Sequence, residues 1–384
     1  MAARIRAAFY RGGTSKAVVF NGADLPADRE VRDRIFLSVL GSPDPYGRQL
    51  DGMGGGLSSL SKVVIVTPSD RDDADVDYTF VQVAVREPLA DYGSACGNMS
   101  SCVGPFAIDE GMVSVGADAD EALVRIFNTN TGQIYHARFP VRNGKPVEEG
   151  DFAIAGVSGS GAKVSLEFLS PGGARTGALL PTGNAVDTLR VEGLGSVEAS
   201  LVDAANPVVF VRADLLGKSA TEPPEKLDGD PVLAERIELV RRAGAVAMGM
   251  ASDTGSVSVA NPKVAMVAGP QSFDALDGTA FAAGSHDINI RLVSMGNFHR
   301  AVTLTGGMCT AVAARIPGSL VQEMARPHSH ILRIGTASGV LPVTAKVEVG
   351  PGGINAVSAG TFRTQRRLME GAVLCPEHVA RSIK

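Results

Sequence analysis

The sequence predicts an α+β fold in which two similar halves each surround one buried helix with short strands. Three observations lead to this fold class. Glycine makes up 45 of the 384 residues, well above the ~7% of an average protein, which indicates many tight turns. Runs rich in β-branched residues lie between those turns, as in a protein of many short strands. Two uncharged segments of small residues have the composition of helices without a solvent-exposed face.

The length and charge exclude several classes of protein. At roughly 150 residues per domain the chain has room for two domains, and 45% apolar with 20% charged residues is an ordinary folded composition. Because 41 Asp and Glu outnumber 36 Lys and Arg, giving a net charge of -5, no nucleic-acid partner is expected. No stretch reaches the ~18 apolar residues of a membrane span, and no signal peptide is visible before Arg11. Four cysteines without a C-x-x-C pair predict free thiols, so we expect a cytoplasmic protein.

The ordinary elements follow from periodicity and turn residues. Helices are expected at residues 27–40 and 231–243, where apolar side chains recur at helical spacing. Strands are expected where β-branched runs are bounded by turns: residues 62–67, 78–85, 206–212, 263–267 and 343–349. The segment 217–230, which contains Pro223 and Pro224, is expected to be a surface loop.

The two unusual helices are expected at residues 97–110 and 308–315. Each follows a turn rich in Gly, Ser or Thr, and neither has a polar stripe. A helix that lacks a polar face is buried on all sides. The chain therefore contains two copies of one plan, with a boundary expected near residue 190.

Cys96 is the strongest candidate for chemistry among the residues themselves. It lies in A-C-G-N at the expected start of the first buried helix, where backbone N–H groups lack partners and favour a thiolate. The same donors would hold a carboxylate or an enolate oxygen. The alternative is an inert cysteine that packs as a small hydrophobic residue.

Lys62 is the second candidate, since it leads the apolar strand V-V-I-V after a segment rich in Gly and Ser. Beside a cavity, loss of hydration would lower its pKa into the range of a general base. The alternative is a lysine at a strand end that keeps its charge in solvent.

Other polar residues offer weaker signals. R-G-G-T-S-K (residues 11–16) combines a guanidinium, a flexible backbone and hydroxyls, which suits a carboxylate as well as it suits a solvated turn. Cys309 in the second buried helix mirrors Cys96, whereas Cys102 and Cys375 are expected to be structural. His328 and His330 lack a third metal ligand nearby, so no metal site is expected.

A series of short motifs runs in order through nearly the whole chain. They are R-G-G-T-S-K (11–16), G-S-P-D-P-Y (41–46), D-G-M-G-G-G-x-S-S-x-S-K (51–62), C-G-N-x-S-S-x-V-G-P-F-A-I-D-E-G (96–111), P-T-G-N (181–184), N-P (206–207), P-K (262–263), S-M-G-N-F-H (294–299), A-A-R-I-P-G (313–318) and R-R-L-M-E-G (366–371). Together they resemble the PrpF-type isomerases, the family of 2-methylaconitate isomerase, methylitaconate isomerase and 4-oxalomesaconate tautomerase.

The resemblance implies a diaminopimelate-epimerase-like fold. Its two similar domains are each a β-barrel-like sheet wrapped around a central helix, with the active site between them. The resemblance also implies that the last strand returns to the first domain. We therefore expect an N-terminal domain at residues 1–190, completed by about residues 366–384, and a C-terminal domain at residues 191–365. Family members need neither metal nor organic cofactor, so none is expected.

The resemblance further implies a cofactor-independent isomerase that moves a proton at an allylic carbon of an unsaturated di- or tricarboxylic acid. A Lys and a Cys transfer protons in the family, and the matching positions are Lys62 and Cys96. His299 matches a family histidine near the site. The residues expected to bind substrate are Arg11, Thr14, Ser15, Ser59, Gly97, Asn98, His299, Gly306 and Gly307. A dienolate is expected to be stabilised by the backbone N–H groups of four of these residues, Gly97, Asn98, Gly306 and Gly307.

Several alternatives stay open at this point. The main expectation is an activity like 2-methylaconitate cis–trans isomerase, with 4-oxalomesaconate tautomerase and methylitaconate or aconitate Δ-isomerase as alternatives within the family. Outside the family, an amino-acid epimerase would need Cys309 as a second thiol, and a silent ligand-binding protein would bind the acid without turnover. The expected ligand is a small unsaturated polycarboxylate, and the compatible assemblies are a homodimer or a homotetramer.

Overall fold

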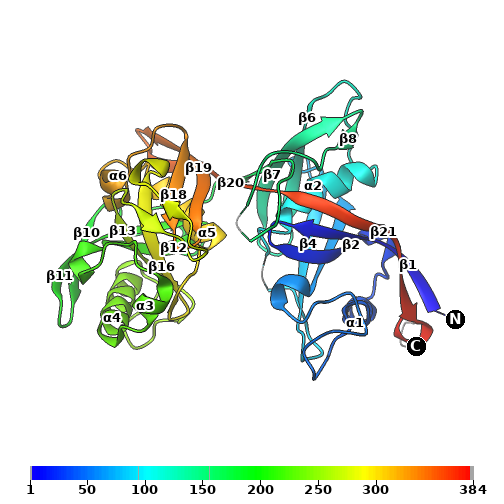
Figure 1. Cartoon of the computed structure of the whole chain (residues 1–384), viewed down its shortest axis with the longest axis horizontal. Coiled ribbons are helices and arrows are strands. Elements are labelled where there is room, and N and C mark those ends of the chain that lie inside the picture. The colour runs from blue at the N-terminus through cyan, green and yellow to red at the C-terminus, as the bar shows by residue number, and fades with distance from the viewer. Residues whose placement is uncertain (1, 94, 155, 381–384) are drawn as a thin grey trace. The chain divides into compact units, whose positions relative to one another are not determined.

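The computed structural model describes residues 2–93, 95–154 and 156–380, and the chain forms two compact units. Unit 1 comprises Met1–Glu167 and Phe362–Lys384, and unit 2 comprises Phe168–Thr361 (Figure 1). The structure thus places the boundary at residue 167 rather than near residue 190. The reason is that β10 (Asp187–Val191) pairs along its length with β11 (Gly195–Ala204) inside unit 2.

The C-terminal segment returns to unit 1, as the resemblance implied. β21 (Gln365–Pro376) runs antiparallel to β1 (Ala2–Gly12) over the whole length of both strands, from Ala2 opposite Pro376 to Gly12 opposite Gln365 (Figure 1). The long backbone ladder ties the two ends of the chain into one sheet. A short helix, α7 (Glu377–Ala380), follows.

The sheet of unit 1 has the pairing order β21, β1, β2, β3, β4, β6, β7. Its remaining strands are β2 (Ser15–Asn21), β3 (Lys62–Pro68), β4 (Val76–Val83), β6 (Glu121–Asn128) and β7 (Gln133–Arg142), with short β5 (Ala90–Asp91), β8 (Lys145–Pro146) and β9 (Val164–Leu169) at the margins. The pairs β2–β3 and β4–β6 are parallel, and the others named here are antiparallel.

Unit 2 repeats this pairing pattern strand for strand. β11, β12 (Asn206–Arg212), β13 (Lys263–Ala268), β16 (Ile288–Ser294), β18 (Ile331–Thr336) and β19 (Gly339–Gly350) pair in that order. Here β12–β13 and β16–β18 are the parallel pairs. β3 of unit 1 therefore corresponds to β13 of unit 2, and β4 corresponds to β16. Unit 2 also contains β14 (Phe273–Asp274), β15 (Ala280–Phe281), β17 (Asn297–Phe298) and β20 (Gly353–Arg363), the last of which extends into unit 1.

Each unit has one helix against the outer face of its sheet. α1 (Arg29–Leu40) contributes its apolar face to a core with β2 and β3, and α4 (Pro231–Ala247) does the same with β11 and β13. Both helices begin at an aspartate, Asp28 or Asp230, whose side chain accepts a backbone N–H of the first turn. The predicted loop at residues 217–230 contains a short helix, α3 (Pro224–Asp228), because Pro224 stands at a first helical position, where a proline is favoured.

The two helices without polar faces are buried as predicted. α2 (Ser100–Asp109) is buried from Ser100 to Ile108, and α5 (Leu304–Ala313) is buried from Gly306 to Ala313. Small residues permit this close packing: a Cβ on Gly104 would lie 2.7 Å from the ring of Phe139. A final short helix, α6 (Leu320–Met324), packs on the same core as α5. The α+β prediction with one central helix in each unit is confirmed, and no helix in the described ranges has the length and apolar character to cross a bilayer.

Candidate active site

One face of β4 contacts both proton-transfer candidates of unit 1. Side chains of a strand alternate between faces, so Tyr78, Phe80 and Gln82 project toward the same side. The hydroxyl of Tyr78 donates to the carbonyl oxygen of Cys96 at 3.4 Å. The ring of Phe80 lies 5.0 Å from the amine of Lys62, and Gln82 accepts a hydrogen bond from that amine. A single strand therefore positions Lys62 and Cys96, which are far apart in sequence.

Lys62 is the first residue of β3 and is only 7% exposed. Its Nζ donates to Oε1 of Gln82 at 2.5 Å, and no carboxylate in the described part of the chain forms an ion pair with it. Burial lowers the pKa of Lys62, and the charge of Cys96 acts in the opposite direction. A desolvated amine of lowered pKa can release and accept a proton closer to neutral pH than an ordinary lysine.

The orientation of the Gln82 amide follows from its other contacts. Its Nε2 donates to the carbonyl oxygens of Ser58 at 3.1 Å and Ser61 at 2.8 Å. Since carbonyl oxygens only accept, the amide nitrogen must face them and the amide oxygen must face Lys62. Sequence reasoning missed Gln82, although a Gln at the alternate position after Tyr78 and Phe80, on the face of the strand that is otherwise apolar or aromatic, was the available signal.

The loop before β3 is organised by a buried glutamine. Gln49 is 1% exposed and donates through Nε2 to the hydroxyls of Ser42 and Ser61, while its Oε1 accepts from the backbone of Gly56. Gly54 allows this approach, since a Cβ there would lie 2.2 Å from the Gln49 side chain. These bonds fix the position of Ser61, the residue directly before Lys62.

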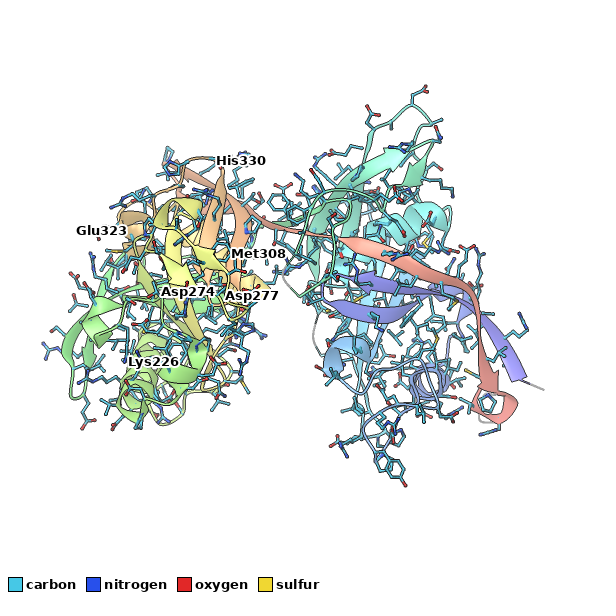
Figure 2. The ribbon with its side chains drawn as sticks, viewed as in Figure 1. Lys226, Asp274, Asp277, Met308, Glu323 and His330 are labelled. Carbon is cyan, nitrogen blue, oxygen red and sulfur yellow. The ribbon has the colours of Figure 1, made fainter. Side chains whose placement is uncertain are left out.

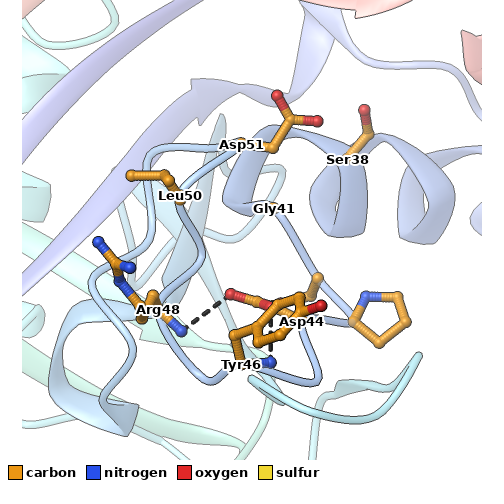
Figure 3. Close-up of a pocket in the computed structure, with 9 residues that line it drawn as sticks. Ser38, Gly41, Asp44, Tyr46, Arg48, Leu50 and Asp51 are labelled. Carbon is orange, nitrogen blue, oxygen red and sulfur yellow. Dashed lines mark hydrogen bonds between the residues drawn. The ribbon is translucent and has the colours of Figure 1, made fainter.

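The motif G-S-P-D-P-Y forms a pocket on this same loop (Figure 3). The pocket has a volume of about 380 Å³, and the carboxylate of Asp44, one of its lining residues, accepts several backbone hydrogen bonds. The backbone N–H groups of Arg48 and Tyr46 donate to the carboxylate and hold the pKa of Asp44 below its usual value. Neither Lys62 nor Cys96 lines this pocket, so we assign the motif to shaping the loop.

Cys96 lies in a turn before α2, because the helix begins at Ser100 rather than at residue 97. Its carbonyl oxygen accepts from the backbone N–H of Ser100 at 3.0 Å and from the Ser100 hydroxyl at 3.1 Å, in addition to Tyr78. The side chain is partly exposed. The backbone N–H groups of Gly97 and Asn98 have no acceptor within the described residues, so they are available to an anion.

Asn98 links the turn after β1 to the returning C-terminal segment. Its Nδ2 donates to the hydroxyl of Thr14 at 3.1 Å, and its Oδ1 accepts from Nε of Arg363 at 3.1 Å. A Cβ on Gly13, whose φ is +52°, would lie 2.3 Å from Oδ1 of Asn98, so the glycine is required for this contact.

Arg363 was not among the residues expected from the sequence. Burial lowers its pKa to about 10, and the charge of Cys96 raises it, so the guanidinium and the thiol are close enough to interact. No local motif marks this arginine, because only the return of the C-terminal segment brings it to Asn98.

The other expected binding residues of unit 1 have different surroundings. Nη1 of Arg11 donates to the carbonyl oxygens of Gly13 and Thr364 and to the Thr364 hydroxyl, at 3.0 to 3.1 Å. Arg11 therefore braces the turn that carries Thr14. Ser15 is buried at the start of β2, and Ser59 is half-buried next to Ser58, which accepts from Gln82.

The expected site residues on α5 already use their hydrogen-bond donors within unit 2. The N–H of Gly306 donates to the Thr303 hydroxyl, and the N–H of Gly307 donates to the Thr303 carbonyl. Both donors are thus used within the first turn of α5 and offer nothing to a dienolate in this structure. Cys309 is fully buried, donates to the carbonyl of Val202, and has a pKa raised by burial.

His299 is half-buried, and burial lowers its pKa. Cys102 and Cys375 are fully buried, in agreement with a structural role. His330 is exposed on unit 2 (Figure 2). Among the described residues, no three His, Cys, Asp or Glu side chains are grouped so that they could hold a metal ion.

Comparisons with known proteins agree with the architecture. The family model described as PrpF protein matches residues 2–376. The chain is 40% identical to the 3-methylitaconate isomerase of Eubacterium barkeri, over 96% of this chain and 97% of that protein. It is 37% identical to the 2-methyl-aconitate isomerase of Shewanella oneidensis (97% of both) and 39% identical to the 4-oxalomesaconate tautomerase of Pseudomonas putida (96% of both).

A solved structure is equally similar. The crystal structure of a methylitaconate-delta-isomerase superposes with a TM-score of 0.92 at 38% identity, covering 100% of this chain and 98% of that one. Sequence and fold thus agree over the full length of the described chain, and the protein belongs to the PrpF family.

Proposed function

We propose that this isomerase moves a proton at an allylic carbon of an unsaturated di- or tricarboxylate without a cofactor, with Lys62 and Cys96 as the proton carriers. The relatives described above are isomerases or a tautomerase at 37–40% identity over nearly their full lengths, and this chain is an isomerase. The observation that carries the assignment to these two residues is the inner face of β4, which contacts both the Lys62 amine and the Cys96 turn.

The reaction begins with removal of a proton from the carbon next to the conjugated carboxylate, by the neutral amine of Lys62 or the thiolate of Cys96. Negative charge spreads over the dienolate, which is stabilised by the N–H groups of Gly97 and Asn98, for which the described residues supply no acceptor. The proton returns to the same carbon after bond rotation, giving cis–trans isomerisation, or two carbons away, giving a shift of the double bond. Because the proton only moves, no electrons are exchanged with another reactant.

Arg363, a cation close to the thiol, binds a carboxylate of the substrate. Arg363 interacts electrostatically with Cys96 and contacts Asn98 through Nε. A guanidinium matches a carboxylate in geometry and charge. We therefore add Arg363 to the expected set, and we retain Thr14, Ser15 and Ser59 as expected binding residues. Arg11 supports them through the turn it braces.

The substrate that we favour is 2-methylaconitate, with methylitaconate or aconitate and 4-oxalomesaconate as alternatives. The chain is similar to relatives of all three names to nearly the same degree. A panel of these acids, followed by proton NMR, distinguishes them: the acid with the highest kcat/KM identifies the reaction, and equal rates on all of them would contradict a single dedicated substrate.

The test of the mechanism is isotope incorporation in deuterated water. The wild-type enzyme is expected to place deuterium at an allylic carbon of the product, and both Lys62→Met and Cys96→Ala are expected to lose at least ~10³-fold in turnover. Lys145→Met, at an exposed position, and Cys102→Ala, within α2, are the matched controls and are expected to retain activity. Near-normal turnover in either test variant would remove that residue from the mechanism.

Two other functional classes have distinct outcomes. An amino-acid epimerase would racemise an amino acid and would require Cys309, which is buried in this structure. A silent binding protein would bind an unsaturated polycarboxylate without any exchange of deuterium. The homodimer or homotetramer and the cytoplasmic location remain predictions, of which light scattering tests the first and cell fractionation tests the second.

A further inference from the structure

The repeat of the fold places a second lysine at the position of Lys62. Lys62 begins β3 and lies opposite Gln82 on β4. In unit 2, Lys263 begins the corresponding strand β13, and the β13–β16 register, with Val264 opposite Val293, brings it level with Ser294. Nζ of Lys263 donates to the Ser294 hydroxyl at 3.2 Å, as Lys62 donates to Gln82. The two units therefore repeat an amine with a neutral partner on the adjacent strand.

The same repeat does not contain a second accessible thiol. The segment C-G-N-M-S-S-C-V (96–103) matches T-G-G-M-C-T-A-V (305–312) position by position in its glycine, methionine and valine. In this alignment of the sequence, Thr305 matches Cys96 and Cys309 matches Ser100. Thr305 already lies inside α5, whereas Cys96 lies four residues before the start of α2. The prediction that Cys309 mirrors Cys96 is corrected by burial: Cys309 is fully buried within α5, whereas Cys96 is partly exposed before α2. Unit 2 therefore has the amine without an accessible thiol.

Among the residues that the structure describes, none gives Lys263 a compensating negative charge. Burial lowers its pKa, and in the described part of the chain no carboxylate forms an ion pair with it or shifts its pKa. A partly buried cation without a partner is unfavourable unless a ligand provides the opposite charge. Ser294 accepts one of the three ammonium hydrogens, which leaves the others for such a ligand.

His299 lies beside this amine and presents a donor. The backbone N–H of His299 donates to the carbonyl oxygen of Leu292 on β16 at 2.8 Å, so His299 flanks β16 two residues along from Ser294, with which Lys263 is level from the other side. In agreement with this placement, burial lowers the pKa of His299 and Lys263 lowers it further. Nδ1 of His299 accepts from the backbone N–H of Ala301 at 3.2 Å. The proton of the neutral ring is therefore on Nε2, which is oriented by that bond as a donor. His299 follows Phe298, which pairs with Val293 next to Ser294.

We propose that Lys263 and His299 form a carboxylate-binding subsite on unit 2, in which the ammonium group supplies the charge and the imidazole Nε2–H a directed hydrogen bond. The ligand is one carboxylate of an unsaturated polycarboxylate. This identity rests on the proposed function, whereas the anion site itself rests on the residues of unit 2. In this proposal Lys263 makes tight substrate binding depend on a further carboxylate of the acid. It takes no part in proton transfer.

The first experiment measures binding of tricarballylate, a saturated tricarboxylate that cannot be isomerised, to the full chain by calorimetry. Lys263→Met is expected to weaken binding by tenfold or more, since an ionic hydrogen bond is lost. Lys263→Arg keeps the charge and is expected to bind within about threefold of wild type. Lys346→Met, which removes a largely exposed lysine of unit 2, is the matched control for net charge and is expected to bind as wild type does.

The second experiment requires no variant to fold. In ¹³C-lysine-labelled wild-type protein, saturation with tricarballylate is expected to move the Lys263 Cε resonance and to raise the pKa of that lysine. An unmoved resonance, or a Lys263→Met protein that binds tricarballylate as wild type does, would overturn the subsite.

Kinetics separate this proposal from the proposed function. Lys263→Met is expected to raise KM at least tenfold while kcat changes less than threefold. A large loss of kcat with unchanged tricarballylate binding would make Lys263 part of the chemistry and contradict an anchoring role. Absence of any isomerisation by the wild-type protein, with the tricarballylate results intact, would defeat the proposed function alone.

Discussion

The amine nitrogen of Lys62 lies 2.5 Å from Oε1 of Gln82, its cross-strand neighbour, and no carboxylate in the described ranges pairs with it. This choice of partner decides the chemistry that the lysine can perform. A carboxylate would stabilise the ammonium form and raise the pKa of Lys62, whereas a neutral amide orients the nitrogen with little added charge stabilisation. The amide is itself held by the carbonyl groups of Ser58 and Ser61. Gln82 is therefore a positioning residue for Lys62.

The substitution Gln82→Glu tests this relationship through the pH profile. A carboxylate at this distance raises the pKa of Lys62, so less neutral amine is present at pH 7. The acidic limb of kcat/KM is expected to move to higher pH by one unit or more, and activity at pH 7 to fall about tenfold. Gln82→Met is the uncharged control, which is expected to lower activity without moving the limb upward. A limb that stays in place in Gln82→Glu would contradict the role of Gln82.

The lowered pKa of Lys62 also predicts how stability depends on pH. In the folded protein this pKa lies below its unfolded value, so between the two values the unfolded state binds more protons. The free energy of unfolding therefore increases as pH rises through that window. Below the folded pKa, the full destabilisation from burying the charged lysine is present. Denaturant unfolding from pH 7 to 10 is expected to show a steeper rise for wild type than for Lys62→Met. Parallel curves would contradict the desolvation of this lysine.

Gly13 is expected to be essential for the contact between Thr14 and Asn98. In Gly13→Ala, the added Cβ would lie 2.3 Å from Oδ1 of Asn98 at a φ of +52°. The contact cannot form without displacement, so activity is expected to fall at least tenfold, together with a loss of ~1–2 kcal/mol in stability. Gly132→Ala is the matched control: its φ is +69°, but its Cβ would meet nothing within 4 Å. It is expected to lose stability alone, as measured by thermal unfolding and steady-state assay.

The four thiols are expected to differ in reactivity. Cys96 is partly exposed, whereas Cys102, Cys309 and Cys375 are buried. Iodoacetamide is expected to modify one thiol in the native protein and four in denaturant, with mass spectrometry locating the first at Cys96. Cys309→Ala is expected to retain activity, and a loss of more than tenfold with the fold intact would restore the second-thiol mechanism.

Patterns in the chain predicted most elements of the fold. The strand at residues 206–212 and the helices at 231–243 and 27–40 were recognised from alternation and helical spacing, because those periods reflect local geometry. Lys62 and Cys96 became candidates because each begins or precedes an element and because both match positions of the family's motifs; their roles stay predictions. Gln82, Arg363 and Lys263 were not assigned roles, since their meaning depends on which strand or segment lies opposite.

The sequence by itself determined the two-part plan, the buried helices and the family, because composition, period and motif are properties of neighbouring residues. It also made Lys62 and Cys96 the candidates for proton transfer, which stay a prediction. Only the tertiary structure decided that Gln82 faces Lys62 and that Arg363 returns to Asn98. These facts depend on strand register and on hydrogen-bond partners from distant segments, which a linear chain does not encode locally.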